Sequence, residues 1–91
     1  MVTSIILISV DRMKINETAQ VLTTMPGISE VYSVSGEYDL VAIVRSKSND
    51  DISELVTNHL LKIDSILKTN TMLAYKTYSK HDLESMFSIG S

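Results

Sequence analysis

Runs of apolar residues, separated by short polar segments, divide the first half of the chain into three strands and a helix. Val2–Val10 is rich in β-branched residues and bounded by polar ones, which predicts a strand. Residues 14–24 place apolar side chains every three or four positions, which predicts an amphipathic helix that ends at Pro26-Gly27. Residues 28–35 and 40–44 predict a second and a third strand.

The second half repeats the alternation of helix and strand. Ser48 is expected to cap a helix whose first turn carries Asp50 and Asp51, because acidic side chains stabilise a helix N-terminus. The predicted buried face of this helix consists of Ile52, Leu55, Val56, His59, Leu60 and Ile63. Residues 66–78 predict a long fourth strand, and residues 79–91 predict a tail with a short amphipathic turn or helix.

The order βαββαβ predicts an α+β fold of the ferredoxin-like kind, with a four-stranded antiparallel sheet and both helices on one face. We assign residues 1–78 to this domain and residues 79–91 to the tail. The third strand is apolar on both faces, since Val41 and Ile43 alternate with Leu40, Ala42 and Val44. Because two helices cover one face only, a second copy of the sheet is expected on the other face, as a sheet-to-sheet dimer.

Composition narrows the classes of function. Hydrophobic residues make up 44% of the 91-residue chain, too many for a disordered protein. Eight basic residues face eleven acidic ones, and the basic residues are scattered, which argues against direct nucleic-acid binding. The sequence has no cysteine, no apolar run of the ~18 residues that a membrane span requires, and no basic leader. We therefore expect a cytoplasmic protein without membrane contact. His59 and His81 belong to no ligand motif, so neither a metal nor a cofactor is expected.

Two polar segments stand out from the aliphatic background. Gly36-Glu37-Tyr38-Asp39 turns between the second and third strands, and Thr69-Asn70-Thr71 lies in the fourth. Each has a purely structural explanation: Gly36 can supply a positive φ, Asp39 can cap the turn, and threonine favours strands. The tyrosines at 32, 75 and 78 are interpreted as amphipathic interface residues.

Taken together, these segments resemble a known family. The βαββαβ order, Met25-Pro26-Gly27-Ile28, the run from Val31 to Leu40 and Thr69-Asn70-Thr71-Met72 are similar to the effector-binding domain of Lrp/AsnC transcription regulators, also called the RAM domain. The similarity covers roughly residues 1–78. Family members also carry an N-terminal helix-turn-helix domain, and this sequence begins at the first strand. It therefore resembles the stand-alone form, without an element that reads DNA.

The resemblance implies a regulatory module that binds a free amino acid between subunits of dimers that assemble into rings. The implied ligand-binding residues are Gly36, Glu37, Tyr38, Asp39, Thr69 and Thr71. Asp39 or Glu37 would accept hydrogen bonds from the ammonium group, while amides near Gly36 and the threonine hydroxyls would donate to the carboxylate. Such a module is expected to co-assemble with full-length Lrp/AsnC regulators.

Two other functions remain open at the level of sequence. A small dimeric α/β-barrel enzyme shares the βαββαβ order, although the predicted strands offer no general base paired with a second catalytic group. A purely structural oligomerisation unit with an empty pocket would show the same pattern. The expectation here is a protein that is not an enzyme.

Overall fold

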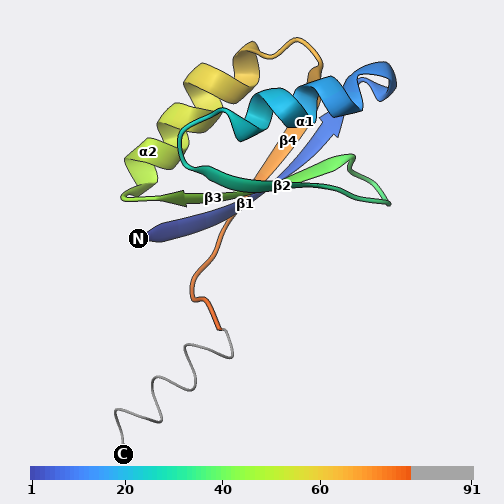
Figure 1. The fold of residues 1–91 in the computed structure, drawn as a ribbon. Helices are drawn as coiled ribbons and strands as arrows, with labels where there is room; N and C mark the ends of the chain where they lie inside the picture. Colours follow the sequence, from blue (N-terminus) through green and yellow to red (C-terminus); the bar gives the residue numbers. More distant parts are fainter. Residues whose placement is uncertain (79–91) are drawn as a thin grey trace, which may run out of the picture.

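The computed structural model describes residues 1–78 and shows the βαββαβ order (Figure 1). The strands are β1 (Val2–Val10), β2 (Ile28–Ser33), β3 (Leu40–Ser46) and β4 (Ile66–Leu73). The helices are α1 (Ile15–Thr23), which follows a short 3-10 turn at Arg12–Lys14, and α2 (Asn49–Glu54). Beyond Glu54 the second helix continues as a π turn (Leu55–His59) and a 3-10 turn (Leu60–Lys62).

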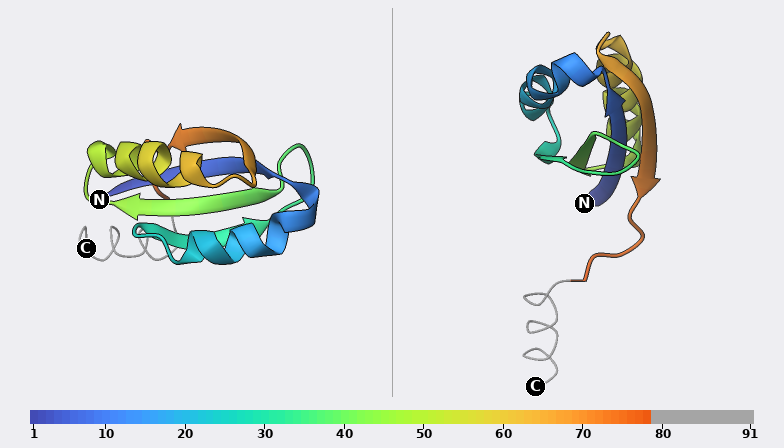
Figure 2. Two further views of the ribbon diagram at one scale, coloured as in Figure 1. Left: turned by 90° about the horizontal axis from the view of Figure 1, so that it is seen from above. Right: turned by 90° about the vertical axis from the view of Figure 1, so that its right-hand side faces the viewer.

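The strands form one antiparallel sheet in the order β2-β3-β1-β4, with β1 paired on both sides. Both helices lie on the same face of this sheet (Figures 1 and 2). The predicted α+β, ferredoxin-like arrangement is therefore confirmed.

The core lies between the sheet and the helices. Alternate residues of β1 and β3 point into it, among them Ile6, Ile8, Leu40, Ala42 and Val44, each fully buried. From the helical layer, the core receives Leu22, Ile52, Leu55 and Leu60. Burial alternates along β1 and β3, as expected for strands, although both were predicted from continuous apolar runs.

The face of the sheet opposite the helices is also apolar. Ile5 and Leu7 of β1 pair with Ile43 and Val41 of β3, and all four side chains stay partly accessible to solvent. Met72, which pairs with Ile5 across β1 and β4, is 44% exposed. A contiguous apolar patch of this kind is characteristic of a protein interface. We call these five residues the open face and keep the sheet-to-sheet dimer as a prediction.

The ends of the elements agree with local hydrogen bonding. The predicted Ser48 cap is confirmed, because its hydroxyl oxygen accepts a hydrogen bond from the Asp51 amide at 3.2 Å. The 3-10 turn before α1 begins in the same way, with Asp11 Oδ1 accepting from the Met13 amide at 3.0 Å. Gly27 follows α1 with φ +89°, a conformation that favours glycine, and its carbonyl accepts from the Arg45 amide at 2.8 Å.

Several predicted boundaries were wrong. β2 ends at Ser33, not residue 35, and β3 continues to Ser46, not residue 44. The largest error is β4, which was predicted to reach residue 78 but ends at Leu73. In the observed register Leu73 pairs with Ser4 and the Ala74 amide donates to the Thr3 carbonyl, and the pairing stops before it reaches Val2 at the start of β1. The same register leaves β1 without a partner for residues 77 and 78, so a strand to residue 78 could not be paired along its whole length. The predicted helix within residues 79–91 lies outside the described residues.

The open face generates a first prediction. Replacing Ile43 by Asp should convert a dimer into monomers, because an unpaired carboxylate buried between two sheets costs several kcal/mol. Analytical ultracentrifugation at micromolar concentration measures the change. The matched control is Val21→Asp on the exposed side of α1, where the side chain is 46% accessible; this variant should remain dimeric. A wild-type chain that sediments as a stable monomer would contradict the dimer.

Candidate functional site

The hairpin between β2 and β3 places the first predicted site segment at one end of the sheet. Its base is closed by the Val34 amide, which donates to the Asp39 carbonyl at 3.0 Å. Gly36 has φ +111°, and a Cβ at this position would meet no atom within 4 Å. The glycine is therefore required by the turn conformation, which confirms the structural explanation, and the space around its backbone is open.

Asp39 attaches this hairpin to the central strand. Its amide donates to the Ile8 carbonyl at 2.9 Å, and its Oδ2 accepts from the Val10 amide at 2.8 Å. The side chain is partly buried beside the end of β1. Asp39 thus has a structural role in addition to the proposed one, since one of its oxygens satisfies a backbone donor.

The other two hairpin residues differ in their surroundings. Glu37 is exposed, and Tyr38 is partly buried. Lys68 of β4 places its Nζ 6.0 Å from the centre of the Tyr38 ring, within the range of a cation–π contact. This contact connects the hairpin with β4, and no spacing in the sequence indicated it.

Thr69 and Thr71 face the helices. Thr69 pairs with Ile8 and Thr71 with Ile6, and paired residues of antiparallel strands lie on the same side of a sheet. Ile8 also pairs with Leu40, so the single strand β1 separates Thr69 from the base of the hairpin. Thr71 lies two residues further along β4. The structure therefore brings Thr69 near the hairpin and places Thr71 at a separate position.

Thr71 lines a hollow of about 350 Å³ between α2 and β4, which we call the α2–β4 hollow. Its apolar wall is formed by Ile52, Val56 and Leu73. Hydroxyl and amide groups complete it, from Asn49, Ser53, Thr57 and Thr71. Sequence reasoning identified Ile52 and Val56 only as a buried helix face, because the periodicity does not show that a gap remains beside them.

A polar cluster occupies the strand edge at β2. The Tyr32 hydroxyl donates to Glu30 Oε2 at 2.6 Å, and this hydrogen bond, followed by the charge of Glu30, raises the pKa of Tyr32. Arg45 Nη1 donates to Ser29 Oγ at 2.7 Å and lies 4.0 Å from Glu30 Oε1. These exposed contacts define the rim of the open face and do not adjoin the hairpin.

Within residues 1–78, no three His, Cys, Asp or Glu side chains come close enough to hold a metal ion. Among the helices of the same residues, none combines the length and the hydrophobicity required to cross a bilayer.

Two curated regulators are similar to the chain. YugG of Bacillus subtilis (strain 168), an uncharacterised HTH-type transcriptional regulator, is 34% identical over 67 residues, which cover 74% of this chain and 40% of that protein. PF1734 of Pyrococcus furiosus, described in the same words, is 35% identical over 72 residues, covering 79% of this chain and 48% of that protein. The chain thus spans less than half the length of these relatives.

Solved structures share the fold over nearly the whole described region. TTHA0845 from Thermus thermophilus superposes with a TM-score of 0.82 at 34% identity, covering 88% of this chain and 100% of that one. PHS023 from Pyrococcus horikoshii superposes with a TM-score of 0.79 at 34% identity, covering 89% of this chain and 98% of that one. NMB0573 from Neisseria meningitidis was solved as a complex with L-Met and superposes with a TM-score of 0.78, covering 86% of this chain and 52% of that one. At 16% identity this similarity shows only that the two proteins share a fold.

The sequence model described as the Lrp/AsnC ligand binding domain matches residues 3–83, most of the chain. This match agrees with the resemblance carried by the hairpin and the threonine strand. The chain therefore belongs to the Lrp/AsnC family and contains its ligand-binding domain.

Proposed function

We propose that this chain is a regulatory module that senses a free amino acid bound between its subunits. The observation that carries the proposal is the separation of two complementary surfaces. The hairpin offers carboxylates and accessible backbone, whereas the α2–β4 hollow offers an apolar wall with hydroxyl groups. An amino acid needs both kinds of surface, because its ends are charged and most of its side chains are apolar.

The hairpin suits the ammonium end of such a ligand. The Val10 bond engages Oδ2 of Asp39, so Oδ1 can accept a charge-assisted hydrogen bond from an ammonium group. Glu37, which is exposed, presents a second carboxylate in the same turn. The open space around Gly36 lets the ligand approach the backbone closely.

The α2–β4 hollow suits the remainder of the ligand. Its volume of about 350 Å³ lies within the range of small-molecule sites. The Thr71 hydroxyl can donate to a carboxylate, and Ile52 and Val56 can contact an aliphatic side chain. None of the residues lining the hollow is charged, so it does not compete with the hairpin for the ammonium group.

Within one subunit these two surfaces are too far apart for one ligand. Asp39 is bonded to Val10 of β1, whereas Thr71 pairs with Ile6, four residues earlier in the same strand. Four residues of an extended strand span about 13 Å, and the hollow extends further, to Leu73. We therefore infer that the hairpin of one subunit faces the hollow of another, with Thr69 at the edge between them.

The comparisons support this proposal at the level of the family. The matching region is described as a ligand-binding domain, and NMB0573, which shares the fold, was solved with L-Met. Since the curated relatives are transcriptional regulators, the proposed role is regulatory and not enzymatic, in the cytoplasm, with full-length Lrp/AsnC regulators as co-assembly partners.

The proposed ammonium acceptor is tested by Asp39→Asn, which removes the charge while the amide oxygen can still accept from Val10. Losing a charge-assisted hydrogen bond should cost about 1.5–3 kcal/mol, so the affinity for the best-bound amino acid should fall at least about tenfold. Isothermal titration against the twenty amino acids measures this loss. Asp39→Ala is the comparison variant, because it should also destabilise the end of β1. Unchanged affinity in a folded Asp39→Asn protein would place the site elsewhere.

The division of the site between subunits is tested by mixing two defective variants. Asp39→Asn and Thr71→Val should each bind weakly alone. In co-refolded mixtures, about one site in four should combine a normal Asp39 with a normal Thr71 and regain wild-type affinity. If both residues serve the same subunit's site, mixing restores nothing. The two outcomes separate an intersubunit site from an intrachain one without knowledge of the ring size.

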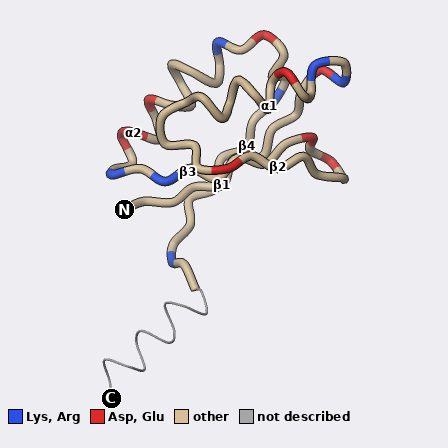
Figure 3. Tube along the Cα trace, in the orientation of Figure 1, with Lys and Arg blue, Asp and Glu red and all other residues tan. Residues whose placement is uncertain are grey.

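We further expect that residues 1–91 alone bind no DNA specifically. The formal net charge is −3, and Figure 3 shows basic and acidic residues interspersed along the described chain. A DNA-binding surface requires several clustered cations to neutralise phosphates. A gel-shift assay at near-physiological salt should show no sequence-dependent complex below micromolar concentration. A tight and specific shift would contradict a role that depends on a DNA-binding partner.

A further inference from the structure

The segment that follows β4 exposes two aromatic side chains. This segment is attached to the sheet by the hydrogen bond from the Ala74 amide to the Thr3 carbonyl at 2.9 Å. Beyond it, Tyr75 is 99% exposed and Tyr78 is 71% exposed. We call Ala74–Tyr78 the arm, and Figures 1 and 2 show that it runs away from the sheet on the side opposite the helices. Exposed tyrosines beside each other are typical of an interface, since each ring is apolar with a polar tip.

A further hollow of the described chain lies on the other side of α2 from the α2–β4 hollow. It has a volume of about 500 Å³ and runs between α2, the end of β3 and the turn after α1; we call it the α2–β3 groove. Its apolar part consists of Met1, Pro26 and Leu55. Its polar part consists of His59 and the charged residues Arg45, Lys47, Asp51 and Glu54. None of the site residues predicted from the sequence lines this groove.

We propose that the arm of one copy docks in the α2–β3 groove of a second copy. The two surfaces match in chemistry: the groove offers apolar groups for the Tyr75 ring and two carboxylates, Asp51 and Glu54, for Lys76. Lys76 holds its Nζ 5.1 Å from the centre of the Tyr78 ring, so the arm presents a cation and a ring as one unit. Two basic residues, Arg45 and Lys47, also line the groove, and Arg45 contacts Ser29 and Glu30 instead of the carboxylates of α2.

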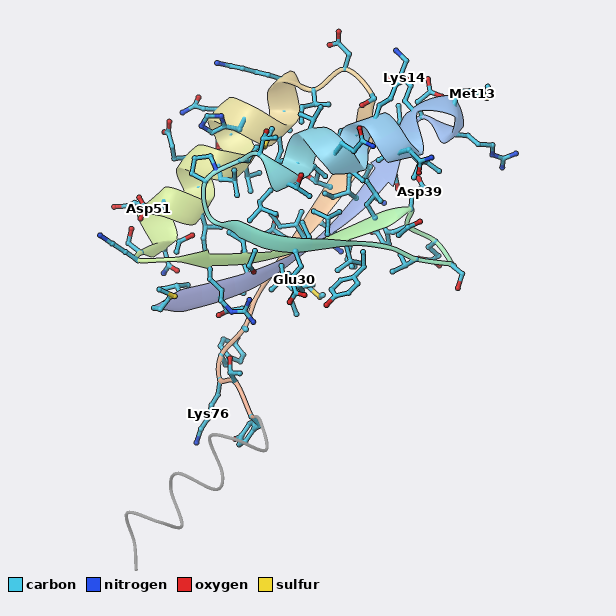
Figure 4. The ribbon with its side chains drawn as sticks, in the orientation of Figure 1. Met13, Lys14, Glu30, Asp39, Asp51 and Lys76 are labelled. Atoms are coloured by element: carbon cyan, nitrogen blue, oxygen red, sulfur yellow. The ribbon has the colours of Figure 1, made fainter. Side chains whose placement is uncertain are left out.

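The course of the chain favours a second copy over the chain's own groove. Figure 4 shows Lys76 on the projecting arm and Asp51 on α2, in different parts of the same chain. To enter its own groove, the arm would have to reverse the direction that it takes after Ala74 (Figure 2). Met1 lines the groove and also the space beside the start of the arm, so donor and acceptor are neighbours on one surface. A two-fold contact between such surfaces lets each arm enter the other copy's groove.

This contact differs from both interfaces considered above. It uses neither the five residues of the open face nor the hairpin, and it does not rest on amino-acid binding. Loss of ligand binding in the Asp39→Asn protein would leave it unaffected, so the two proposals can fail separately.

The absence of cysteine from the sequence permits a direct test by crosslinking. A size-tagged copy with Tyr75→Cys is mixed with an untagged copy with His59→Cys and treated with a short bismaleimide reagent. The expected product is a crosslinked heterodimer, and the double variant should also form crosslinks between chains. The matched control replaces His59→Cys by Val21→Cys on the exposed side of α1. A yield no higher than this control, or a crosslink confined to single chains of the double variant, would overturn the proposal.

Charge reversal provides a second test with the same readout. Lys76→Glu in the Tyr75→Cys copy should lower the heterodimer yield about threefold or more, because a cation beside two carboxylates is replaced by an anion. Glu54→Lys in the His59→Cys copy should restore the yield. An unchanged yield in the first experiment, or no restoration in the second, would show that Lys76 does not lie beside Glu54 in the complex.

Discussion

The two-sided pairing of β1 is the constraint on which the rest of the structure depends. Its alternate residues supply the centre of the core, and its backbone bonds to β3 and β4 fix the register of both. The register in turn decides that Thr69 and Thr71 face the helices while Met72 belongs to the open face. The hairpin is attached to the same strand through Asp39. Every surface proposed to be functional is therefore positioned relative to β1.

The protein presents incomplete surfaces rather than one finished pocket. The hairpin offers carboxylates, the α2–β4 hollow offers an uncharged cavity, and the open face is apolar and partly accessible to solvent. In the proposed assembly, another subunit would complete each of these surfaces, because every copy carries the complementary one. The geometry of that assembly would then contribute to specificity together with the residues themselves.

The sequence predicted the order of elements well, because the apolar runs of β1 and β3 and the Ser48 cap are local signals. The end of β4 was not predictable in this way, since it depends on the register in which β4 pairs with β1. For the site, the turn at Gly36 was visible in the sequence, but the bond between Asp39 and Val10 joins residues far apart in the chain. The α2–β4 hollow could not be predicted from the sequence for a similar reason, since a gap between two elements depends on how they pack against each other.

The hydrogen bond between Asp39 and Val10 has a consequence for signalling. One carboxylate holds the end of the central strand and, in the proposed site, also faces the ligand. Drawing the negative charge of Asp39 toward a bound ammonium group would change how firmly β1 is held at its C-terminal end. Ligand binding would then change the protection of the Val10 amide against hydrogen exchange. In this way β1 itself would couple the ligand site to the core.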